Sequence, residues 1–545
     1  MEIGSLITGA ITDTLAVSLP LFRVELAIAA TIVLLLLCRM LPVLRNADSA
    51  LIALGGAGFA LWYAWSDLRG LPGSPWNLVD ATAAPVRQEL FGGLLVFDSL
   101  TAAIRLLLAG FLVLYVLFTK VSGIPDREDG ADFYTLVLGG ALGMCLMASA
   151  NHLLMVFMAV EMASVPSYAL AAILKGRKAA SEAGLKYAVY GAGAAGIMLY
   201  GISLLAGVTG TCHLPSMAGE LARIVGEGGA GGEVLVLALG GLMLAVGLAF
   251  KLSAVPFHFW CPDVFEGAAA EVGAFLSVAS KAAAVALLLR IAFGLGATDA
   301  AGAAAVAGAG EVRHFMVYVI GLMAAVTCTL GNLAAYGQTN MKRLLAYSTI
   351  AHAGYLMMGA AAAVALMGVS SAGASRAVAA LVFYLATYLF MNLAAFAIVA
   401  LLRNRLRSEE IASYAGLVRT SPGIVVATTV VLVSLIGLPP LAGFVSKFLV
   451  FSSLAEAIKA GAEKPLMLVL LVVGGVNTVI SLFYYLRVLK VMTFDPPPSD
   501  RAGEAIPLVS LPGAVVTAFA VPVVILGLFW SGLYAAAQLA GTFAS

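Results

Sequence analysis

The chain has 545 residues, of which 62% are hydrophobic and 11% are charged, and its formal net charge is +1. Such an apolar composition is typical of a polytopic membrane protein and excludes an ordinary water-soluble domain. The charge is close to zero and no basic stripe with interleaved aromatic residues is present, so we expect no nucleic-acid partner.

Long apolar runs follow one another along the whole chain. A helix needs about 20 apolar residues to span the hydrocarbon core, and the chain supplies about fourteen such runs. Backbone polar groups in lipid must pair within the segment, and these runs are too long for barrel strands, so the sequence predicts an all-α polytopic bundle. The expected spans are 20–42, 49–67, 94–119, 131–149, 151–174, 183–208, 233–260, 271–295, 313–335, 341–366, 376–403, 422–450, 464–492 and 508–536.

Basic residues gather in alternate loops, which predicts that those loops face the cytoplasm. They are Arg45, Lys120, Arg127, Lys175, Arg177, Lys178, Lys186, Lys342, Arg343, Arg403, Arg405, Arg407, Arg487 and Lys490. The long loops near 68–93, 209–232 and 296–312 hold few basic residues. We therefore expect both termini on the outer face of the membrane.

Four ionisable residues lie inside long apolar runs: Glu161, Lys251, Lys281 and Lys447. A charge at the centre of a bilayer costs about 2.5 to 3.5 kcal/mol, so such residues normally face a bundle interior and mark an ion pathway. One acid and three lysines therefore predict a proton or cation relay. Three alternatives stay open at this point: a static ion pair between Glu161 and Lys251, a purely structural role for Lys281, and a Lys447 side chain that snorkels to the interface.

Prolines lie close to these charges. Pro166 and Pro256 each follow a charged residue by five positions, and a proline cannot donate to the carbonyl four residues before it. The carbonyls of Met162 and Leu252 are therefore expected to be free. The segment 437–440 (GLPP, with Pro439 and Pro440) breaks a third helix in the same way.

The broken helices 233–260 and 422–450 occupy corresponding places in two halves of the chain. Such paired interruptions are typical of inverted-repeat transporters, whose site lies near the middle of the membrane. We therefore expect four regions: three N-terminal helices in 1–130, a first five-helix repeat in 131–295, a second in 313–492, and a last helix in 493–545.

Weaker signals come from His258 and His352, which could carry protons because imidazole titrates near neutrality. A packed, hydrogen-bonded histidine is an equally good interpretation of each. Glu25, Arg105 and Arg290 lie within or near helices, and we expect them to snorkel at helix ends or to pair helices.

No cofactor or metal site is predicted in this chain. The five cysteines are scattered singly, without the spacing of an iron–sulfur or zinc site. The glycine clusters do not follow a strand and open a helix, which a dinucleotide or phosphate loop requires.

Several runs together are similar to one known family. The chain resembles the N-type antiporter-like subunit of respiratory complex I, the counterpart of mitochondrial subunit 2 of NADH:ubiquinone oxidoreductase. The resemblance covers about residues 90–495. It is carried by LGMCLMASANHLLMVFMAVEMASVPSYALAA, SEAGLKYAVYGAGAAGIMLYGISLLAGVTGT, GLAFKLSAVPFHFWCPDVFEGA, LGNLAAYGQTNMKRLLAYSTIAHAGYLMMG and VSLIGLPPLAGFVSKFLVF.

The resemblance implies a fourteen-helix subunit with two inverted five-helix repeats and broken seventh and twelfth helices. In that family the acid on helix five, here Glu161, pairs with the lysine on helix seven, here Lys251. Lys281 matches the central proton carrier on helix eight, and Lys447 matches the lysine that passes charge onward. His352 matches a family histidine near this path.

The resemblance also implies partners and a location. The chain is expected to translocate protons in the membrane arm of an NADH:quinone oxidoreductase, beside other membrane-arm subunits in a bacterial inner membrane. Flavin, iron–sulfur clusters and the site for quinone are expected in partner chains. The rival functions are a subunit of a cation/proton antiporter, a subunit of a hydrogenase-type membrane complex, and a structural scaffold.

One segment departs from the family pattern. After FW-x-P-D-V the family usually reads E-G-A-P-T-P-V, whereas this chain reads Glu266-Gly267-Ala268-Ala269-Ala270-Glu271-Val272. We expect the start of helix eight to be less rigid without the prolines. Glu271 falls in its first turn, where the helix dipole favours an acid.

Overall fold

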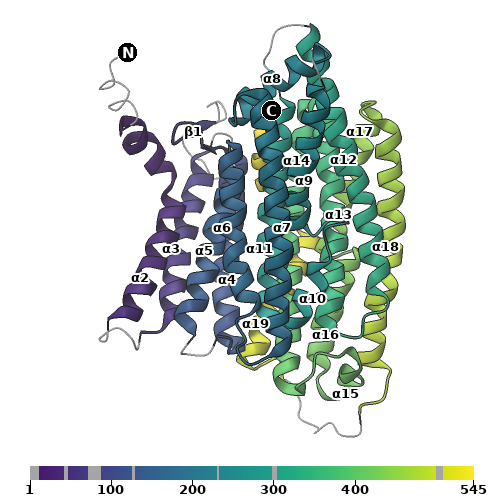
Figure 1. Cartoon of the computed structure of the whole chain (residues 1–545). Helices are drawn as coiled ribbons and strands as arrows, with labels where there is room; N and C mark the ends of the chain where they lie inside the picture. The colour runs from purple at the N-terminus through teal and green to yellow at the C-terminus, as the bar shows by residue number, and fades with distance from the viewer. Residues whose placement is uncertain are drawn as a thin grey trace.

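The computed structural model describes residues 11–41, 47–71, 87–125, 129–229, 232–297, 303–498 and 507–544. Within these ranges nearly all residues are helical, and the long helices stand side by side in one bundle (Figure 1). Arg45 and Arg127, which the sequence assigns to the basic loops, lie outside the described residues.

The all-α membrane fold is confirmed. Twelve helices of the described chain are long and apolar enough to cross a membrane. A thirteenth candidate is the pair Asp13–Leu21 and Arg23–Met40, which is bent by 81°. The predicted span 422–450 is a pair of shorter helices, α16 (Pro422–Ile436) and α17 (Ala442–Lys459), separated by a break. The grouping into two inverted repeats stays a prediction.

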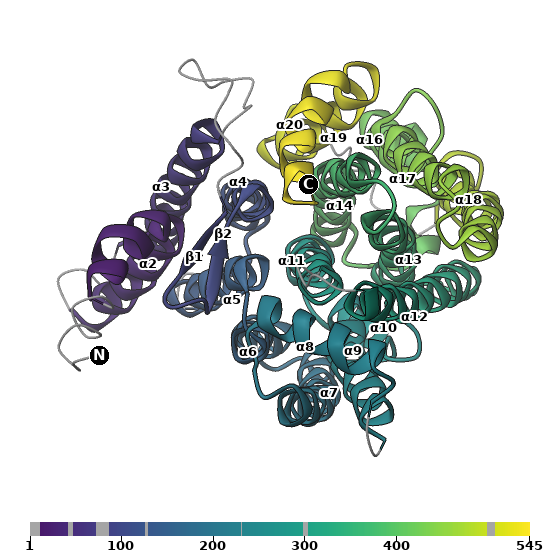
Figure 2. The ribbon, with the colours of Figure 1, turned by 90° about the horizontal axis from the view of Figure 1, so that it is seen from above.

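The N-terminal helices form a separate pair against the rest of the bundle (Figure 2). Arg105 Nε on α4 donates to Glu25 Oε1 on α2 at 2.7 Å, and both side chains are fully buried. These two residues therefore pair helices and do not snorkel. The elements of this part are α2 (Arg23–Met40), α3 (Ser49–Gly70), β1 (Gln88–Leu90), β2 (Leu95–Phe97), α4 (Ser99–Ser122), α5 (Gly130–Ser149) and α6 (Leu153–Ala171).

The predicted span 233–260 is broken, as expected. The helix α9 ends at Leu252, and Ser253 adopts a left-handed conformation with φ 55°. A new helix, α10, begins at Trp260. The elements of this part are α7 (Lys178–Thr209), α8 (Leu214–Gly226), α9 (Glu233–Leu252), α10 (Trp260–Gly267) and α11 (Ala270–Gly296).

The second broken helix has a similar construction. The helix α16 ends before Gly437, whose φ of 91° suits glycine, and α17 begins at Ala442. A Cβ on Gly443 would lie 1.8 Å from the Ser434 carbonyl oxygen, so only glycine allows α17 to start this close to α16. The elements are α12 (Ala303–Ala335), α13 (Met341–Met367), α14 (Ser371–Leu406), α15 (Leu417–Thr420), α16 (Pro422–Ile436), α17 (Ala442–Lys459) and α18 (Lys464–Thr493).

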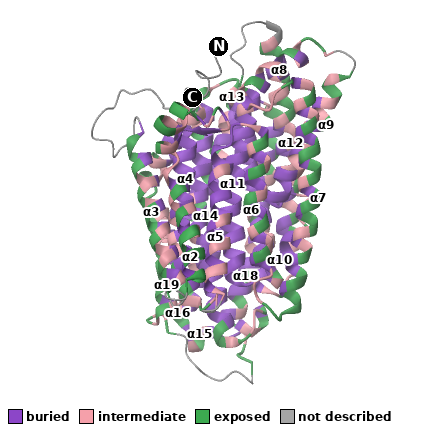
Figure 3. Cartoon of the chain, turned by 60° about the vertical axis from the view of Figure 1, so that its left-hand side comes forward, coloured by how far each residue is buried: buried purple, intermediate pink, exposed green. Residues whose placement is uncertain are grey.

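Three helices form the centre of the bundle. Seen from above, α11, α13 and α14 lie inside a ring of other helices (Figure 2). In the most apolar 18-residue stretch of each helix, all residues of α11, 94% of those of α13 and 89% of those of α14 are buried. The interior helices are accordingly purple, and green residues lie on the outside (Figure 3). A polar residue on α11 therefore faces protein and not lipid.

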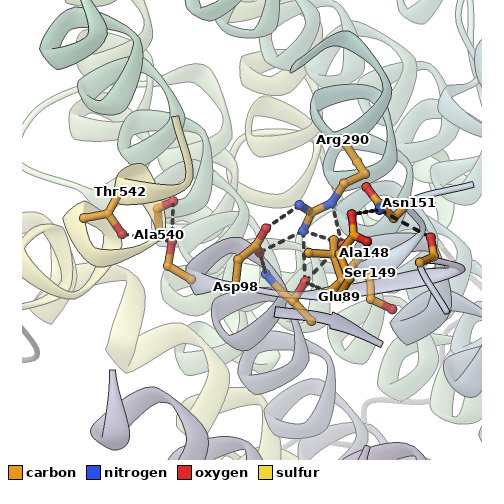
Figure 4. A network of polar contacts seen from close by, with 12 residues as sticks. Glu89, Asp98, Ala148, Ser149, Asn151, Arg290, Ala540 and Thr542 are labelled. Carbon is orange, nitrogen blue, oxygen red and sulfur yellow. Dashed lines mark hydrogen bonds and ion pairs between the residues drawn. The ribbon is translucent and has the colours of Figure 1, made fainter. Parts of the chain in front are cut away.

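The first described residues, before α2, and the end of α20 (Ser531–Gly541) lie at the same end of the bundle (Figure 1). Near the start, Ser18 Oγ accepts a hydrogen bond from Phe91 N in the β1–β2 hairpin at 2.9 Å. The last helices are α19 (Leu511–Leu528) and α20 (Ser531–Gly541). Close to the end of the chain, Thr542 Oγ1 donates to Ser99 Oγ at 3.0 Å (Figure 4). Which side of the membrane this end faces stays a prediction.

Candidate functional site

Lys281 lies in the middle of α11 and is only 1% exposed. Its ammonium donates to the Leu252 carbonyl at 2.6 Å and to Ser253 Oγ at 2.5 Å, and the Lys251 carbonyl lies at 3.4 Å. These acceptors form the broken end of α9, where carbonyls lack partners within the helix. The carbonyl of Leu252 that the sequence predicts to be free is therefore bound by a lysine that lies 29 residues further along the chain.

Lys251 occupies the last turn of α9 and is 1% exposed. Among the described residues, its Nζ has no hydrogen-bond partner. The direct contact with Glu161 that the resemblance implies is therefore not made in this structure. Glu161, on α6, is half-buried and close enough to interact electrostatically with Lys251. A static ion pair would need a direct contact with Glu161, which Lys251 lacks here. A buried lysine without a bonded partner is costly, so a static ion pair does not explain this position.

Lys447 lies at the second broken helix in a similar arrangement. Its Nζ donates to the Ile436 carbonyl, the last residue of α16, at 2.8 Å. The ammonium is 4.4 Å from the ring centre of Tyr355, much as Lys281 lies 5.8 Å from the ring of Trp260. Lys447 is only 4% exposed, so the interpretation that it snorkels to the interface is wrong.

His352 lies in a buried polar cluster between these lysines. Its Nδ1 is 2.7 Å from the Tyr384 hydroxyl, and its ring centre lies 5.0 Å from that of Tyr388. The Tyr388 hydroxyl is 3.3 Å from Ser277 Oγ. Ser277 lies one helical turn before Lys281 on α11. The cluster therefore reaches the helix of the first lysine.

The cluster also reaches the second lysine. The ring centre of His352 is 6.0 Å from that of Tyr355, whose face lies under the Lys447 ammonium. Sequence analysis missed these tyrosines. Tyr384 and Tyr388 lie four residues apart in YLATYL, on one face of α14, and that spacing was the available signal.

His258 does not join this cluster by any described contact. It lies in the segment between α9 and α10. Its Nδ1 is buried and has no hydrogen-bond partner among the residues that the structure describes, and its ring centre lies 4.4 Å from that of Phe259. Pro256 lies in the same segment, and Pro439 and Pro440 lie in the corresponding break between α16 and α17. The prolines therefore mark both breaks.

The altered segment before α11 is held by two contacts that the sequence does not reveal. Glu271 is fully buried and accepts two hydrogen bonds from Arg403 on α14, at 3.1 and 3.2 Å. Lys342 donates to the Ala268 carbonyl at 2.7 Å and pairs with Glu409 at 2.8 Å. The first turn of α11 is thus tied to two neighbouring helices without the family's prolines.

We predict that Glu271→Leu destabilises the purified protein by about 3 kcal/mol, because it leaves the Arg403 guanidinium without its carboxylate in a largely buried place. Glu271→Gln keeps a hydrogen-bond acceptor and should therefore lose less stability than Glu271→Leu. The measurement is the midpoint of unfolding in detergent, monitored by tryptophan fluorescence. Equal midpoints for the wild type and the leucine variant would show that this ion pair does not hold the segment.

Metal ligands are not gathered anywhere in the described residues: no group of three or more histidine, cysteine or acidic side chains has a geometry that could hold an ion. The five cysteines are free and lie apart. Besides its buried arginine–carboxylate pairs, the described interior therefore concentrates lysine, histidine, tyrosine, amide and hydroxyl groups.

Comparison with known proteins places the chain in a family. Residues 150–481 match the family described as NADH:quinone oxidoreductase/Mrp antiporter, TM. The chain is 40% identical to NADH-quinone oxidoreductase subunit N 2 of Sorangium cellulosum, over 95% of this chain and 96% of that protein. It is 39% identical to NADH-quinone oxidoreductase subunit N of Anaeromyxobacter sp., over 83% of this chain and 85% of that protein.

Solved structures also resemble this chain. A chain of respiratory complex I from Thermus thermophilus with bound aureothin superposes with a TM-score of 0.69 at 32% identity, covering 94% of this chain and 98% of that one. A chain of the Mrp complex from Dietzia sp. has a TM-score of 0.74 at 19% identity, over 96% and 99% of the two chains, which shows a shared fold alone. The chain therefore belongs to the NADH:quinone oxidoreductase/Mrp antiporter family and, within it, to the N-type subunits.

Proposed function

We propose that this chain is a proton-translocating subunit in the membrane arm of an NADH:quinone oxidoreductase. One observation carries the proposal: two broken helices each end on a buried lysine ammonium, and a polar cluster around His352 lies between the two lysines. Two relatives that cover 95% and 83% of the chain are named subunit N of NADH-quinone oxidoreductase.

The chemistry at each lysine is the gain and loss of one proton. The carbonyls of Leu252 and Ile436 stabilise an ammonium, because they are unpaired ends of helices that carry partial negative charge. When a lysine loses its proton, the neutral amine can no longer donate to all of these acceptors. A proton that arrives at Lys281 is therefore held at a defined place until a change nearby moves it on.

Glu161 and Lys251 supply that change in the proposal. A carboxylate that approaches a buried ammonium stabilises it, and one that withdraws makes the ammonium easier to deprotonate. Lys251 and Lys281 are also close enough to repel each other when both are charged. Movement of Glu161 relative to Lys251 therefore alters how firmly Lys281 holds its proton, and the His352 cluster offers a path to Lys447.

The redox reaction belongs to partner chains in this proposal. This chain serves as a subunit without a redox cofactor of its own, beside other membrane-arm subunits, and flavin and iron–sulfur clusters are placed in partners. The quinone that the complex uses is not assigned to this chain. The proposed location is a bacterial inner membrane, with the basic loops in the cytoplasm and both termini outside.

The test is to purify the tagged protein with its partners in a mild detergent. We expect the assembly to reduce a quinone with NADH and to contain flavin and iron. An assembly that lacks flavin and iron but exchanges cations for protons in vesicles would contradict the proposal and indicate an antiporter subunit.

A further inference from the structure

An apolar cavity lies beside α9, away from the lysines. It has a volume of about 310 Å³, at the lower end of the range of about 300 to 1,000 Å³ that is typical of sites for small molecules. Its walls come from α7, α8, α9, α11 and α12, and α9 and α12 supply most of them. Among the described residues that line it, Glu311 is charged and the others are apolar.

The cavity runs lengthwise between α9 and α12. On α9 its lining extends from Val234 to Leu248, about 21 Å along a helix, and on α12 from Glu311 to Ile320, about 14 Å. One leaflet of a bilayer contains about 15 Å of hydrocarbon, which is half of the whole core. The length of the cavity therefore matches that of one acyl chain in a single leaflet.

The side of the cavity opens toward lipid. Val234 on α9 and Phe315 on α12 line it and are 38% and 37% exposed, so the opening faces the outside of the bundle. Leu235, Leu239 and Leu322 on the same two helices are exposed apolar side chains. The outer surface of a membrane-spanning bundle contacts lipid tails, which are as apolar as leucine. The cavity is therefore continuous with the lipid-facing surface.

The apolar walls decide what the cavity can hold. A water molecule in a protein cavity needs about two to four polar partners, and these walls do not offer them. Hydrocarbon makes dispersion contacts with apolar side chains and gives up no hydrogen bond when it enters. An acyl chain from the adjoining bilayer is thus the occupant that suits the walls, the length and the opening.

Acidic side chains gather at the end of the cavity near α8, which is the end of the bundle where the chain terminates (Figure 1). Glu311 is exposed there. On α8, Arg223 donates to both Glu220 and Glu227, so two carboxylates already balance its charge. Arg313 donates to a backbone carbonyl at the end of α11. This end of the cavity therefore favours a cationic headgroup over an anionic one.

We propose that the cavity binds one acyl chain of a phospholipid whose headgroup is an amine, as in phosphatidylethanolamine, and that the ammonium lies beside Glu311. The chain packs between α9 and α12 and reaches Leu248, three residues before Lys251. It thus contacts the helix whose broken end binds Lys281. The site depends on the membrane fold and not on the proposed function.

Photo-crosslinking of the complete complex tests the site. The complex would be reconstituted in vesicles that contain phosphatidylethanolamine with a diazirine near the end of one acyl chain, and the labelled residues would be identified by mass spectrometry. Val319→Trp and, on the opposite wall, Ala245→Leu reduce the cavity. Val326→Trp is the matched control, because it makes the same change two turns further along α12 at a residue that is 45% exposed and lies outside the cavity lining.

We expect the wild type and Val326→Trp to be labelled at the deep end of the cavity, around Leu248 and Ile320. Val319→Trp and Ala245→Leu should lose this labelling severalfold. Labelling that is confined to outward-facing residues such as Leu239, or that is equal in all four proteins, would overturn the proposal. If the two cavity variants fail to assemble, the labelled positions in the wild type decide between the same outcomes.

Two further probes test the headgroup and the source of the chain. The same diazirine chain on phosphatidylglycerol, which is anionic, should label the cavity severalfold less, and Glu311→Gln should reduce this difference. Equal labelling of the wild type by the two lipids would overturn the amine headgroup. A quinone with a diazirine on its isoprenoid tail should leave the cavity unlabelled; labelling in preference to phosphatidylethanolamine would overturn the phospholipid as occupant.

Discussion

Replacing Lys281 by methionine is expected to abolish proton translocation in an assembled complex. The change removes the ammonium that binds the Leu252 carbonyl and Ser253 Oγ, and with it the group that holds the proton. Loss of a positioned proton-transfer group typically slows a reaction about 100-fold or more. Quinone reduction and proton uptake in vesicles should both fall by about that factor if electron transfer and proton movement are coupled.

Two control variants separate this effect from damage to the fold. Lys281→Arg keeps a charge and several donors but holds its proton too firmly to release it, so it should assemble and remain slow. Lys490→Met changes an exposed lysine, whose side chain is 66% exposed, and should behave like wild type. Proton uptake at the wild-type rate in an assembled Lys281→Met complex would remove Lys281 from the path.

Local features of the site were predictable from the sequence because they depend on near neighbours in the chain. A proline four residues after Leu252 predicted a free carbonyl, and the structure shows that carbonyl accepting a hydrogen bond. Glycine and two prolines likewise marked the end of α16, where Lys447 binds the Ile436 carbonyl. Long apolar runs predicted the helices themselves.

Contacts between distant segments were not predictable in this way. Hydrophobic periodicity says which face of a helix is buried but not which partner covers it. The sequence therefore predicted neither the Tyr384 hydroxyl beside His352 nor the pairing of Glu271 with Arg403, 132 residues away. For Arg290 it allowed snorkelling, whereas the residue is 2% exposed and binds Asp98.

The state of the Glu161–Lys251 pair also lies beyond sequence reasoning. The resemblance implies contact, but in this structure Lys251 Nζ has no hydrogen-bond partner within the described residues. A pair that opens and closes would present either arrangement. The separated arrangement is the one in which Lys251 is least stabilised by the acid, and in the proposed mechanism that is the step at which a proton moves on.

Replacing Arg290 by methionine is expected to prevent assembly of the subunit. The Arg290 guanidinium on α11 donates to both carboxylate oxygens of Asp98, to Thr101 Oγ1 at 2.9 Å and to the Ala148 carbonyl at 2.9 Å (Figure 4). The Arg290 guanidinium carbon, Cζ, also lies 4.7 Å from the ring centre of Phe543 near the end of the chain. One side chain thus ties the central helix to α4, α5 and the C-terminal segment.

Removing one member of a buried ion pair costs about 3 to 5 kcal/mol, because the remaining charge stays buried without its partner. Most domains have a total stability of only about 5 to 15 kcal/mol, so a loss of this size is enough to deplete the folded protein. The amount of subunit recovered in the purified complex, measured by blotting against the tag, should therefore fall sharply for both Arg290→Met and Asp98→Leu.

The double variant Asp98→Leu with Arg290→Met gives the sharper result. It leaves no unpaired charge, and apolar replacements of a complete buried pair are often tolerated. We therefore expect the double variant to assemble better than either single variant, although Thr101 and the Ala148 carbonyl lose a donor. Losses that simply add would mean that Asp98 and Arg290 act independently, and that the ion pair is not what fixes α11, and with it Lys281, relative to α4 and α5.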